Sequence, residues 1–488
     1  MNKLRSIMFV GTGSDVGKSV INAAFCRIFL QDGYHPAPFK AQNMSLNSYP
    51  TPDGLEIGRA QAVQAEACGI ECRVEMNPIL LKPTNNTNAQ IVFNGKPIGN
   101  KSAKEYFTGT DRNHLFSEAM KSFDVLQAEY QPIVIEGAGS ISEMNLWDKD
   151  IVNMRVALYA NADTYLIADI DKGGVFGSVY GTLQLLPPHE RDLIKGIIIN
   201  KFRGDLSLFA EGKTMLENLT GKPVVGIIPY FRDIAIEQED SVVLERKTST
   251  ATDEKINIAV VLLRHMSNFT DFNMLEQVPE IHLFYTADPQ ELLKADIIII
   301  PGSKNTIVDM LHLRNSGLAK MIVALQKEGK SVYGICGGYQ IMGLEINDPQ
   351  HIEGEIESIP GLGILPVITT LTNEKKTEQC RFTFLQLLEE NTGYEIHMGI
   401  THAQNESPLC KINNETNDGY YLNSKTWGSY IHGIFDNQSI IENILQQVNS
   451  SLKVSIDYRA FKEEQYNKLA NLVRSSIDMD YIYKELAK

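Results

Sequence analysis

The sequence predicts two α/β domains with parallel sheets, followed by a helical C-terminal extension. Short apolar runs such as SIMFV and TYLIADI in the first half, and DIIIIPG and SVYGIC in the second, are each followed by a glycine-containing loop and a helical stretch. Continuous apolar strands are buried on both faces, as in parallel sheets covered by helices. The polar stretch LERKTSTATDEK, residues 244–255, separates the two series. We therefore expect domains at residues 1–245 and 253–442 and an extension at 443–488.

The composition excludes some classes of protein. Of the 488 residues, 43% are hydrophobic and 22% charged, which is typical of a globular enzyme. A net charge of −15 opposes binding of nucleic acid, because the surface repels phosphates. No apolar run is long enough to span a bilayer, and SIMFV leads into a glycine loop instead of a cleavage site. We therefore expect a cytoplasmic protein that neither spans a membrane nor binds nucleic acid.

Two further features concern charge and cysteine. An acidic protein that binds a polyanionic substrate needs a local basic pocket, and Lys40, Arg59, Arg73 and Lys82 are candidates, although each could equally be a solvated surface charge. The six cysteines are few for this length, and the pair Cys68/Cys72 has no second pair at metal-site spacing. Apart from Cys336, we expect the cysteines to be reduced and structural.

The first chemical motif is the loop GTGSDVGKS, residues 11–19, which joins the first strand to an amphipathic helix. In such a phosphate loop, backbone N–H groups cradle phosphates, a lysine reaches the β and γ oxygens, and a hydroxyl can bind Mg²⁺. The strict pattern has glycine where this chain has Thr12, so the loop is a variant. It resembles the loop of dethiobiotin synthetase and its relatives, which use ATP to phosphorylate a carboxylate. We predict ATP binding by Thr12, Gly13, Val16, Gly17, Lys18 and Ser19.

Polar residues follow other strands of the same predicted sheet. Glu136 ends the strand before GAGS, where its carboxylate can hold Mg²⁺ opposite Ser19. Asp169 and Asp171 precede another glycine turn, and the amide of Asn200 can contact the adenine of ATP. Each acid is as often a helix cap as a ligand, so the hypothesis depends on their meeting at one edge of the sheet.

The second chemical motif is GICGG, residues 334–338. Cysteine between glycines at a strand–turn–helix junction is typical of a nucleophile elbow, although a lone cysteine is commonly a small core residue. His432, in SYIHGIFDN, follows another apparent strand and is the candidate base for Cys336. Backbone N–H groups at Gly337 and at Gly302 or Ser303 can hold an oxyanion.

The order of these motifs resembles a class I (triad-type) glutamine amidotransferase domain, in which cysteine takes the glutamine amide as a thioester and releases ammonia. The usual members carry a glutamate two residues after the histidine, where this chain has Ile434. The third member of the triad is therefore open. The branch that lacks this glutamate belongs to cobalamin synthesis, and Glu395 in GYEIHMG is a motif of that branch.

Taken together, the motifs resemble the cobyric acid synthase family over roughly residues 6–440. The stretches that carry the resemblance include APFKAQNMSLNSY, EGAGS, DIVNM, ADIDKGGVFGS, PGSKNT and GICGGYQIMG. The resemblance implies amidation of the b, d, e and g carboxylates of adenosylcobyrinic a,c-diamide, with ATP, Mg²⁺ and glutamine. It also implies that Lys40, Gln42, Asn43 and Asp150 line the corrinoid or phosphate cleft.

Three alternatives and several questions stay open. Cobyrinic a,c-diamide synthase is the nearest relative, but it has a GPD-type stretch where this chain has AQNMSLNS. Another phosphate-loop glutamine amidotransferase, or a phosphate-loop ATPase that acts as a switch, would share the first motif. The sequence leaves open the order of amidations, the ammonia route, and whether the chain forms a homo-oligomer.

Overall fold

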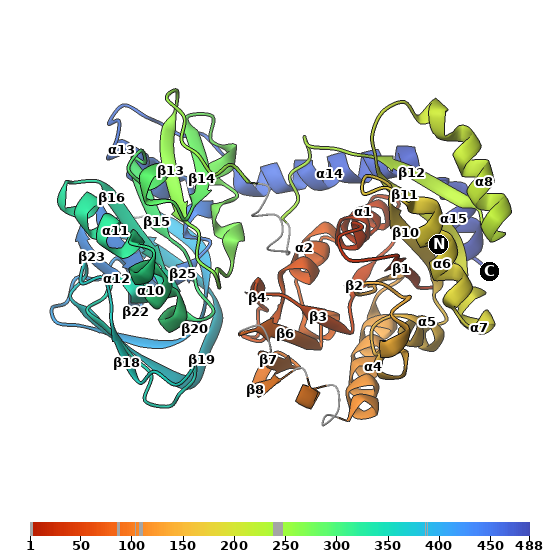
Figure 1. The fold of residues 1–488 in the computed structure, drawn as a ribbon, viewed down its shortest axis with the longest axis horizontal. Coiled ribbons are helices and arrows are strands. Elements are labelled where there is room, and N and C mark those ends of the chain that lie inside the picture. The colour runs from red at the N-terminus through yellow and green to blue at the C-terminus, as the bar shows by residue number, and fades with distance from the viewer. Residues whose placement is uncertain are drawn as a thin grey trace.

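The computed structural model describes residues 3–84, 88–102, 104–106, 111–237, 247–385, 387 and 389–488. Two lobes are joined by one long helix (Figure 1). We call the part up to residue 237 the N-terminal domain and residues 247–446 the C-terminal domain. The prediction of α/β architecture with a parallel sheet in each half is confirmed, and the exact domain boundaries stay a prediction.

A six-stranded, fully parallel sheet forms the centre of the N-terminal domain. Its order is β12 (Val224–Pro229), β11 (Ile194–Phe202), β10 (Asp163–Asp169), β1 (Ile7–Gly11), β9 (Ile133–Glu136) and β2 (Ala37–Phe39). Helices of this part of the chain include α1 (Lys18–Gln31), α4 (Arg112–Glu129), α5 (Met154–Ala160), α6 (Val175–Leu185), α7 (Pro188–Arg191) and α8 (Ala210–Thr220). Two apolar clusters form its core, as expected for a sheet buried on both faces.

Between β2 and α4, the chain forms smaller elements that the sequence analysis did not predict. They are a four-stranded sheet of β3 (Gln42–Met44), β6 (Ile79–Pro83), β7 (Asn88–Phe93) and β8 (Lys96–Ser102), a hairpin of β4 (Ser48–Pro50) and β5 (Glu56–Gly58), helix α2 (Arg59–Ala67) and the turn η1 (Val74–Met76). In Figure 1 the β4 hairpin lies on the side of the N-terminal domain that faces the C-terminal domain.

The C-terminal domain has a mixed sheet in which only the last strand is antiparallel. Its order is β14 (Ile281–Thr286), β13 (Ile256–Val261), β15 (Ile297–Ile300), β16 (Ser331–Ile335), β24 (Thr426–Ser429) and β23 (Tyr420–Asn423). The accompanying helices and turns are η5 (Phe269–Phe272), η6 (Leu275–Gln277), α9 (Pro289–Leu292), α10 (Thr306–Asn315), α11 (Leu318–Lys327) and α12 (Gly337–Met342).

A second sheet in the C-terminal domain was also not predicted. It is built on the long antiparallel pair β19 (Val367–Phe384) and β20 (Glu390–Ala403), with β17 (Glu345–Asn347), β18 (Ser358–Pro360), β21 (Cys410–Ile412), β22 (Thr416–Asp418) and β25 (Ile431–His432). More buried and less buried residues alternate along parts of both long strands. The sequence analysis missed these strands because they lack the continuous apolar run that marks a buried parallel strand.

The C-terminal helices return to the N-terminal domain. After η7 (Ile434–Asp436) and α13 (Gln438–Gln446), helix α14 (Tyr458–Ser476) crosses from one lobe to the other, and α15 (Met479–Leu486) ends beside it (Figure 1). Leu469 and Val473 of α14 share an apolar cluster with Phe25 of α1, and Arg474 pairs with Asp32 at 2.9 Å. The predicted extension therefore packs against the phosphate-loop domain.

Two expectations from composition bear on the described residues. All six cysteines are buried and none forms a disulfide, in agreement with reduced thiols. Within the described part of the chain, no helix combines the length and the apolar character that a bilayer span requires.

Candidate active sites

The phosphate loop adopts the strand–loop–helix arrangement that its sequence predicted. Gly17 has φ +99° and lies so close to Asn200 that a Cβ there would be 2.2 Å from Asn200 Nδ2. The Asn200 amide donates to the carbonyl of Val16 at 2.8 Å, so it supports the loop. Lys18 Nζ donates to the carbonyls of Gly13 and Gly139, at 3.0 and 2.9 Å, which brings the ammonium over the loop.

Glu136 lies opposite Ser19, as predicted, but it has other partners as well. The Ser19 hydroxyl and the Lys40 ammonium both donate to Glu136 Oε1, at 2.7 and 2.8 Å, and Gln64 donates to Oε2 at 2.7 Å. Burial alone would raise the pKa of Glu136, but Lys40 and the hydrogen bonds hold it below its usual value. The carboxylate and hydroxyl suit Mg²⁺, whereas Lys40 competes for the same carboxylate oxygen.

A cavity of about 710 Å³ joins the phosphate loop to the predicted substrate residues. Thr12, Gly13 and Val16 are not on its lining. The predicted residues that do line the cavity are Gly17, Lys18, Ser19, Lys40, Gln42, Asn43, Glu136, Asp150 and Asn200.

The basic residues of this cavity differ from those that the sequence suggested. Of the four candidates only Lys40 lines it; Arg59 pairs with Glu237 at 2.5 Å, Arg73 with Glu129 and Lys82 with Glu56. Three further cations line the cavity, Arg112, Lys149 and Lys201, which the sequence analysis did not single out.

The acids near the cavity have structural partners. Asp150 accepts backbone N–H groups of Val152 and Asn153, and burial raises its pKa. Asp169 pairs with Lys201 at 2.8 Å, and Asp171 pairs with Arg203 at 2.5 Å. Among the described residues, no group of three or more acidic, histidine or cysteine side chains is arranged to hold a metal.

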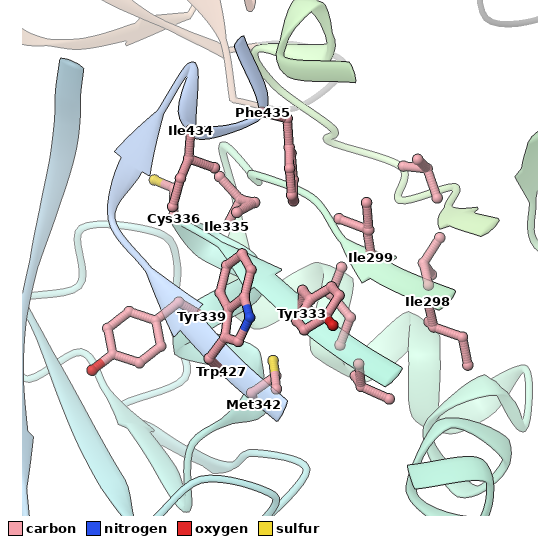
Figure 2. Close-up of a cluster of buried hydrophobic side chains, with 14 of the residues drawn as sticks. Ile298, Ile299, Tyr333, Ile335, Cys336, Tyr339, Met342, Trp427, Ile434 and Phe435 are labelled. Atoms are coloured by element: carbon pink, nitrogen blue, oxygen red, sulfur yellow. The ribbon is translucent and has the colours of Figure 1, made fainter. Parts of the chain in front are cut away.

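The second site is centred on the turn between β16 and α12. Cys336 has φ +51° and ψ −108°, a backbone conformation that L residues rarely adopt and that strained nucleophile elbows use. The turn is so close-packed that a Cβ on Gly338 would lie 1.9 Å from the Ile300 carbonyl oxygen. Figure 2 shows the Cys336 sulfur pointing away from Trp427 and Tyr333 of the apolar cluster, with Ile434 beside it.

The residues predicted to hold an oxyanion meet at this turn. A Cβ on Gly337 would be 2.7 Å from the backbone nitrogen of Ser303, and a Cβ on Gly302 would be 3.2 Å from His432 Cε1. The loop after β15 therefore lies against both the cysteine turn and the histidine.

His432 has an acidic partner that the sequence analysis did not identify. Its Nδ1 donates to Asp271 Oδ2 at 2.7 Å, and both side chains are 1% exposed. Burial by itself would lower the pKa of His432, but Asp271 and then Cys336 raise it to about 10. Asp271 stands in η5, 161 residues before the histidine, and the position that the sequence suggested for this role holds the apolar Ile434.

Glu395, the acid of the GYEIHMG motif, does not pair with His432 but with two other side chains. It pairs with Lys376 at 2.5 Å and with His397 at 3.3 Å. The Cys336 thiol lies 3.7 Å from the carbonyl oxygen of Ile396, so the strand that carries Glu395 passes beside the nucleophile.

Two family models match this chain, one on each half. Residues 7–242 match a CobQ/CobB/MinD/ParA nucleotide binding domain, and residues 257–440 match a CobB/CobQ-like glutamine amidotransferase domain. Three whole-chain relatives are each named cobyric acid synthase. The protein of Parabacteroides distasonis is 59% identical over 99% of both chains, that of Bacteroides fragilis 58% identical over 100% of this chain and 99% of its own, and that of Syntrophobacter fumaroxidans 44% identical over 99% and 98%.

The N-terminal domain has a phosphate loop beside a cavity, and the C-terminal domain has a cysteine elbow near a buried histidine. Together with the two family matches, these features define an ATP-dependent glutamine amidotransferase. The level of identity over the full chain then decides the family. This chain belongs to the cobyric acid synthase family.

Proposed function

We propose that this protein uses ATP and glutamine to convert the b, d, e and g carboxylates of adenosylcobyrinic a,c-diamide into amides. The observation that carries the proposal is the joint lining of one cavity by the phosphate loop and by the segment from Lys40 to Asn43. A carboxylate is a poor electrophile, so it must be activated before an amine can attack it. A cavity of about 710 Å³ allows a substrate carboxylate and the terminal phosphate of ATP to approach each other.

In the N-terminal domain, Lys18 stabilises the charge of the transferred phosphoryl group, and the acceptor carboxylate becomes an acyl phosphate. Ser19 and Glu136 are the residues that would hold Mg²⁺, which supplies charge neutralisation at the phosphates. Lys40 lies 2.8 Å from Glu136 Oε1 and balances the buried carboxylate. Arg112 and Lys149 line the cavity beside acidic residues such as Glu143 and Asp150, and they are the cations that would contact a substrate carboxylate there.

In the C-terminal domain, Cys336 attacks the side-chain amide of glutamine. His432 takes the thiol proton and delivers it to the leaving ammonia, and Asp271 holds the imidazole through Nδ1. Backbone N–H groups at Gly337 and Ser303 stabilise the oxyanion. Water hydrolyses the resulting thioester to glutamate and free Cys336, and ammonia attacks the acyl phosphate in the other domain, forming the amide as inorganic phosphate leaves.

The experiment that tests the proposal is mass spectrometry of the product formed from cobyrinic a,c-diamide with ATP, Mg²⁺ and glutamine. We expect a product with four new amides. A product with two new amides, formed from cobyrinic acid itself, would assign the chain to a,c-diamide synthesis instead. ATP hydrolysis with no amidation of either corrinoid would favour a switch ATPase. Mg²⁺ dependence and a cytoplasmic location are part of the proposal and are measured separately, and the oligomeric state stays open.

A further inference from the structure

Large apolar side chains lie exposed along one part of the N-terminal cavity. Met44 of β3 is 57% exposed and Leu146 of the turn η2 (Met144–Lys149) is 38% exposed, and both line the cavity together with Trp147. None of the six residues of η2 is buried. Exposed large apolar side chains that gather at a cavity wall indicate a binding surface. We call Met44, Leu146 and Trp147 the apolar rim.

Arg112 holds the two parts of the apolar rim together. Gln42 and Met44 lie on the same side of β3, because side chains alternate along a strand. Arg112 donates to Gln42 Oε1 at 3.3 Å and to the carbonyl of Lys149 at 2.6 Å. The same guanidinium therefore joins β3 to the last residue of η2, and the two elements form one wall of the cavity.

The other end of η2 is tied to the phosphate loop. The indole N–H of Trp147 donates to the carbonyl of Ile141 at 3.0 Å, which holds the ring in place. The N–H of Ile141 in turn donates to the carbonyl of Gly11, the residue that ends β1, at 3.1 Å. The position of the apolar rim is thus fixed relative to the loop that binds phosphate.

The order of the strands places the apolar rim on one side of the phosphate loop and Asn200 on the other. The loop follows β1, which lies between β10 and β9 in the sheet. Asn200 belongs to β11, beyond β10, whereas η2 follows β9 and β3 follows β2. Loops that follow neighbouring parallel strands meet at one edge of the sheet. With the adenine expected beside Asn200, the part of the cavity at the rim is open to the second substrate.

We propose that the apolar rim supports the face of the corrin macrocycle and recognises the ring without selecting one of its carboxylates. The inference rests on the proposed function. A corrin is apolar on its faces and carries its carboxylates on side chains around its edge. One phosphate loop has to activate four of these carboxylates, so the ring must bind in four orientations. Apolar contact is non-directional and tolerates this rotation, whereas hydrogen bonds to fixed partners select one orientation.

This division of tasks separates the ring from its edge. Lys18 and Lys40 lie at the phosphate loop, where the carboxylate to be activated must lie, and Lys149 lies at the end of η2, where another carboxylate of the edge can reach it. Loss of a rim side chain should therefore slow all four amidations by the same factor. Loss of a contact to the edge should instead slow one amidation more than the others.

The test compares Leu146→Ser and Met44→Ser with the parent in the full-length protein. Met144→Ser is the matched control, because Met144 belongs to the same turn and is 56% exposed but is not on the lining of the cavity. Leu146→Met keeps an apolar contact of a different shape. Equilibrium dialysis without ATP measures binding of dicyanocobinamide, a corrinoid in which every peripheral carboxyl is an amide. Steady-state kinetics give KM for cobyrinic a,c-diamide and for ATP, and mass spectrometry at equal conversion gives the proportions of the partly amidated intermediates.

We expect each serine variant to bind dicyanocobinamide about three- to tenfold more weakly than the parent, the range for covering part of one apolar side chain. KM for the corrinoid should rise by a similar factor, while KM for ATP and kcat stay at the parent values. The proportions of the intermediates should also match the parent. Leu146→Met and Met144→Ser should behave as the parent in every measurement.

Three results would overturn the inference. They are parent-like binding and KM in both serine variants, accumulation of one intermediate, which would indicate a contact to one edge of the ring, and a lower kcat with unchanged corrinoid binding. A parent that amidates cobyrinic a,c-diamide but does not bind dicyanocobinamide is equally contrary. Failure of the proposed function is recognised separately: the serine variants would still bind dicyanocobinamide more weakly than the parent, but the parent would form no amide from cobyrinic a,c-diamide.

Discussion

The carboxylate of Asp271 joins the side chain of His432 to the backbone beside it. Oδ2 lies 2.7 Å from His432 Nδ1, and Oδ1 accepts the N–H of Gly433 at 3.0 Å. Both oxygens of one buried acid thus fix the position and the tautomer of the imidazole. The acidic partner of His432 therefore comes from η5, in the loop after β13, whereas the position two residues after the histidine holds Ile434.

Asp271→Asn should lower glutamine-dependent amidation by about a hundredfold or more. The pKa of His432, raised to about 10 by Asp271 and Cys336 against the effect of burial, should fall when the carboxylate charge is removed. The imidazolium is then lost at lower pH, and Cys336 should react more slowly with iodoacetamide at pH 7. The alkylation rate as a function of pH checks the direction. Asp480→Asn, on the exposed side of α15, is the control; an unchanged profile in Asp271→Asn would contradict the assignment.

Cys336→Ser should abolish amidation with glutamine and keep most of the rate with excess ammonia. The reason is that the N-terminal domain activates the carboxylate without help from the thiol. His432→Ala should behave in the same way, since the base serves only thioester chemistry. The measurement is the ratio of the two donor-dependent rates on folded protein. Equal loss with both donors is what a purely structural cysteine predicts, because a serine hydroxyl buried without a partner destabilises the fold.

Lys18→Ala should abolish amidation with either donor. Loss of the ammonium from the phosphoryl-transfer site should reduce the rate by about a hundredfold or more. Lys172→Ala is the matched control, because Lys172 is 56% exposed and lies near the loop at Asp15. Near-parental rates in Lys18→Ala would show that the loop is only structural.

Glu136→Gln should change the dependence of amidation on Mg²⁺ concentration. The carboxylate is held by Ser19 and Lys40 in the phosphate-loop site, and an amide binds a hard cation less well. The expected result is a higher Mg²⁺ concentration at half-maximal rate. A superimposable titration would remove Glu136 from the metal site.

Lys375→Met should destabilise the contact between the two domains. Lys375 of β19 pairs with Glu56 of β5, and both side chains are buried. Lys375 and Lys82 hold the pKa of Glu56 below its usual value, although burial would raise it, so removal of Lys375 leaves the buried carboxylate with Lys82 as its remaining ammonium partner. Breaking a buried pair costs about 3 kcal/mol. Urea unfolding measures the loss, and Lys468→Met, at an exposed pair in α14, should change stability by about 0.5 kcal/mol at most.

The sequence by itself determined the features that depend on neighbouring residues. The loop before Lys18 and the turn at Cys336 both depend on glycines that are adjacent in the sequence. A Cβ on Gly17 would collide with Asn200, and a Cβ on Gly338 would collide with the Ile300 carbonyl, so only glycine fits at either position. The continuous apolar runs predicted the two parallel sheets. A strand that is buried on both faces has apolar residues at every position instead of alternating apolar and polar ones. Both patterns can be recognised in the sequence without knowing which distant residues are in contact.

Only the tertiary structure decided which distant residues meet. Asp271 and Asn268 reach His432 across more than 160 residues, and Ser48 reaches Asn268 across 220. Arg59 and Lys82, which the sequence offered as candidates for a basic pocket, pair with buried glutamates. Arg112, which it did not offer, lines the cavity. A single buried acid, amide or arginine does not produce a repeating pattern in the sequence. Its role depends on the charged or hydrogen-bonding group that the fold places beside it.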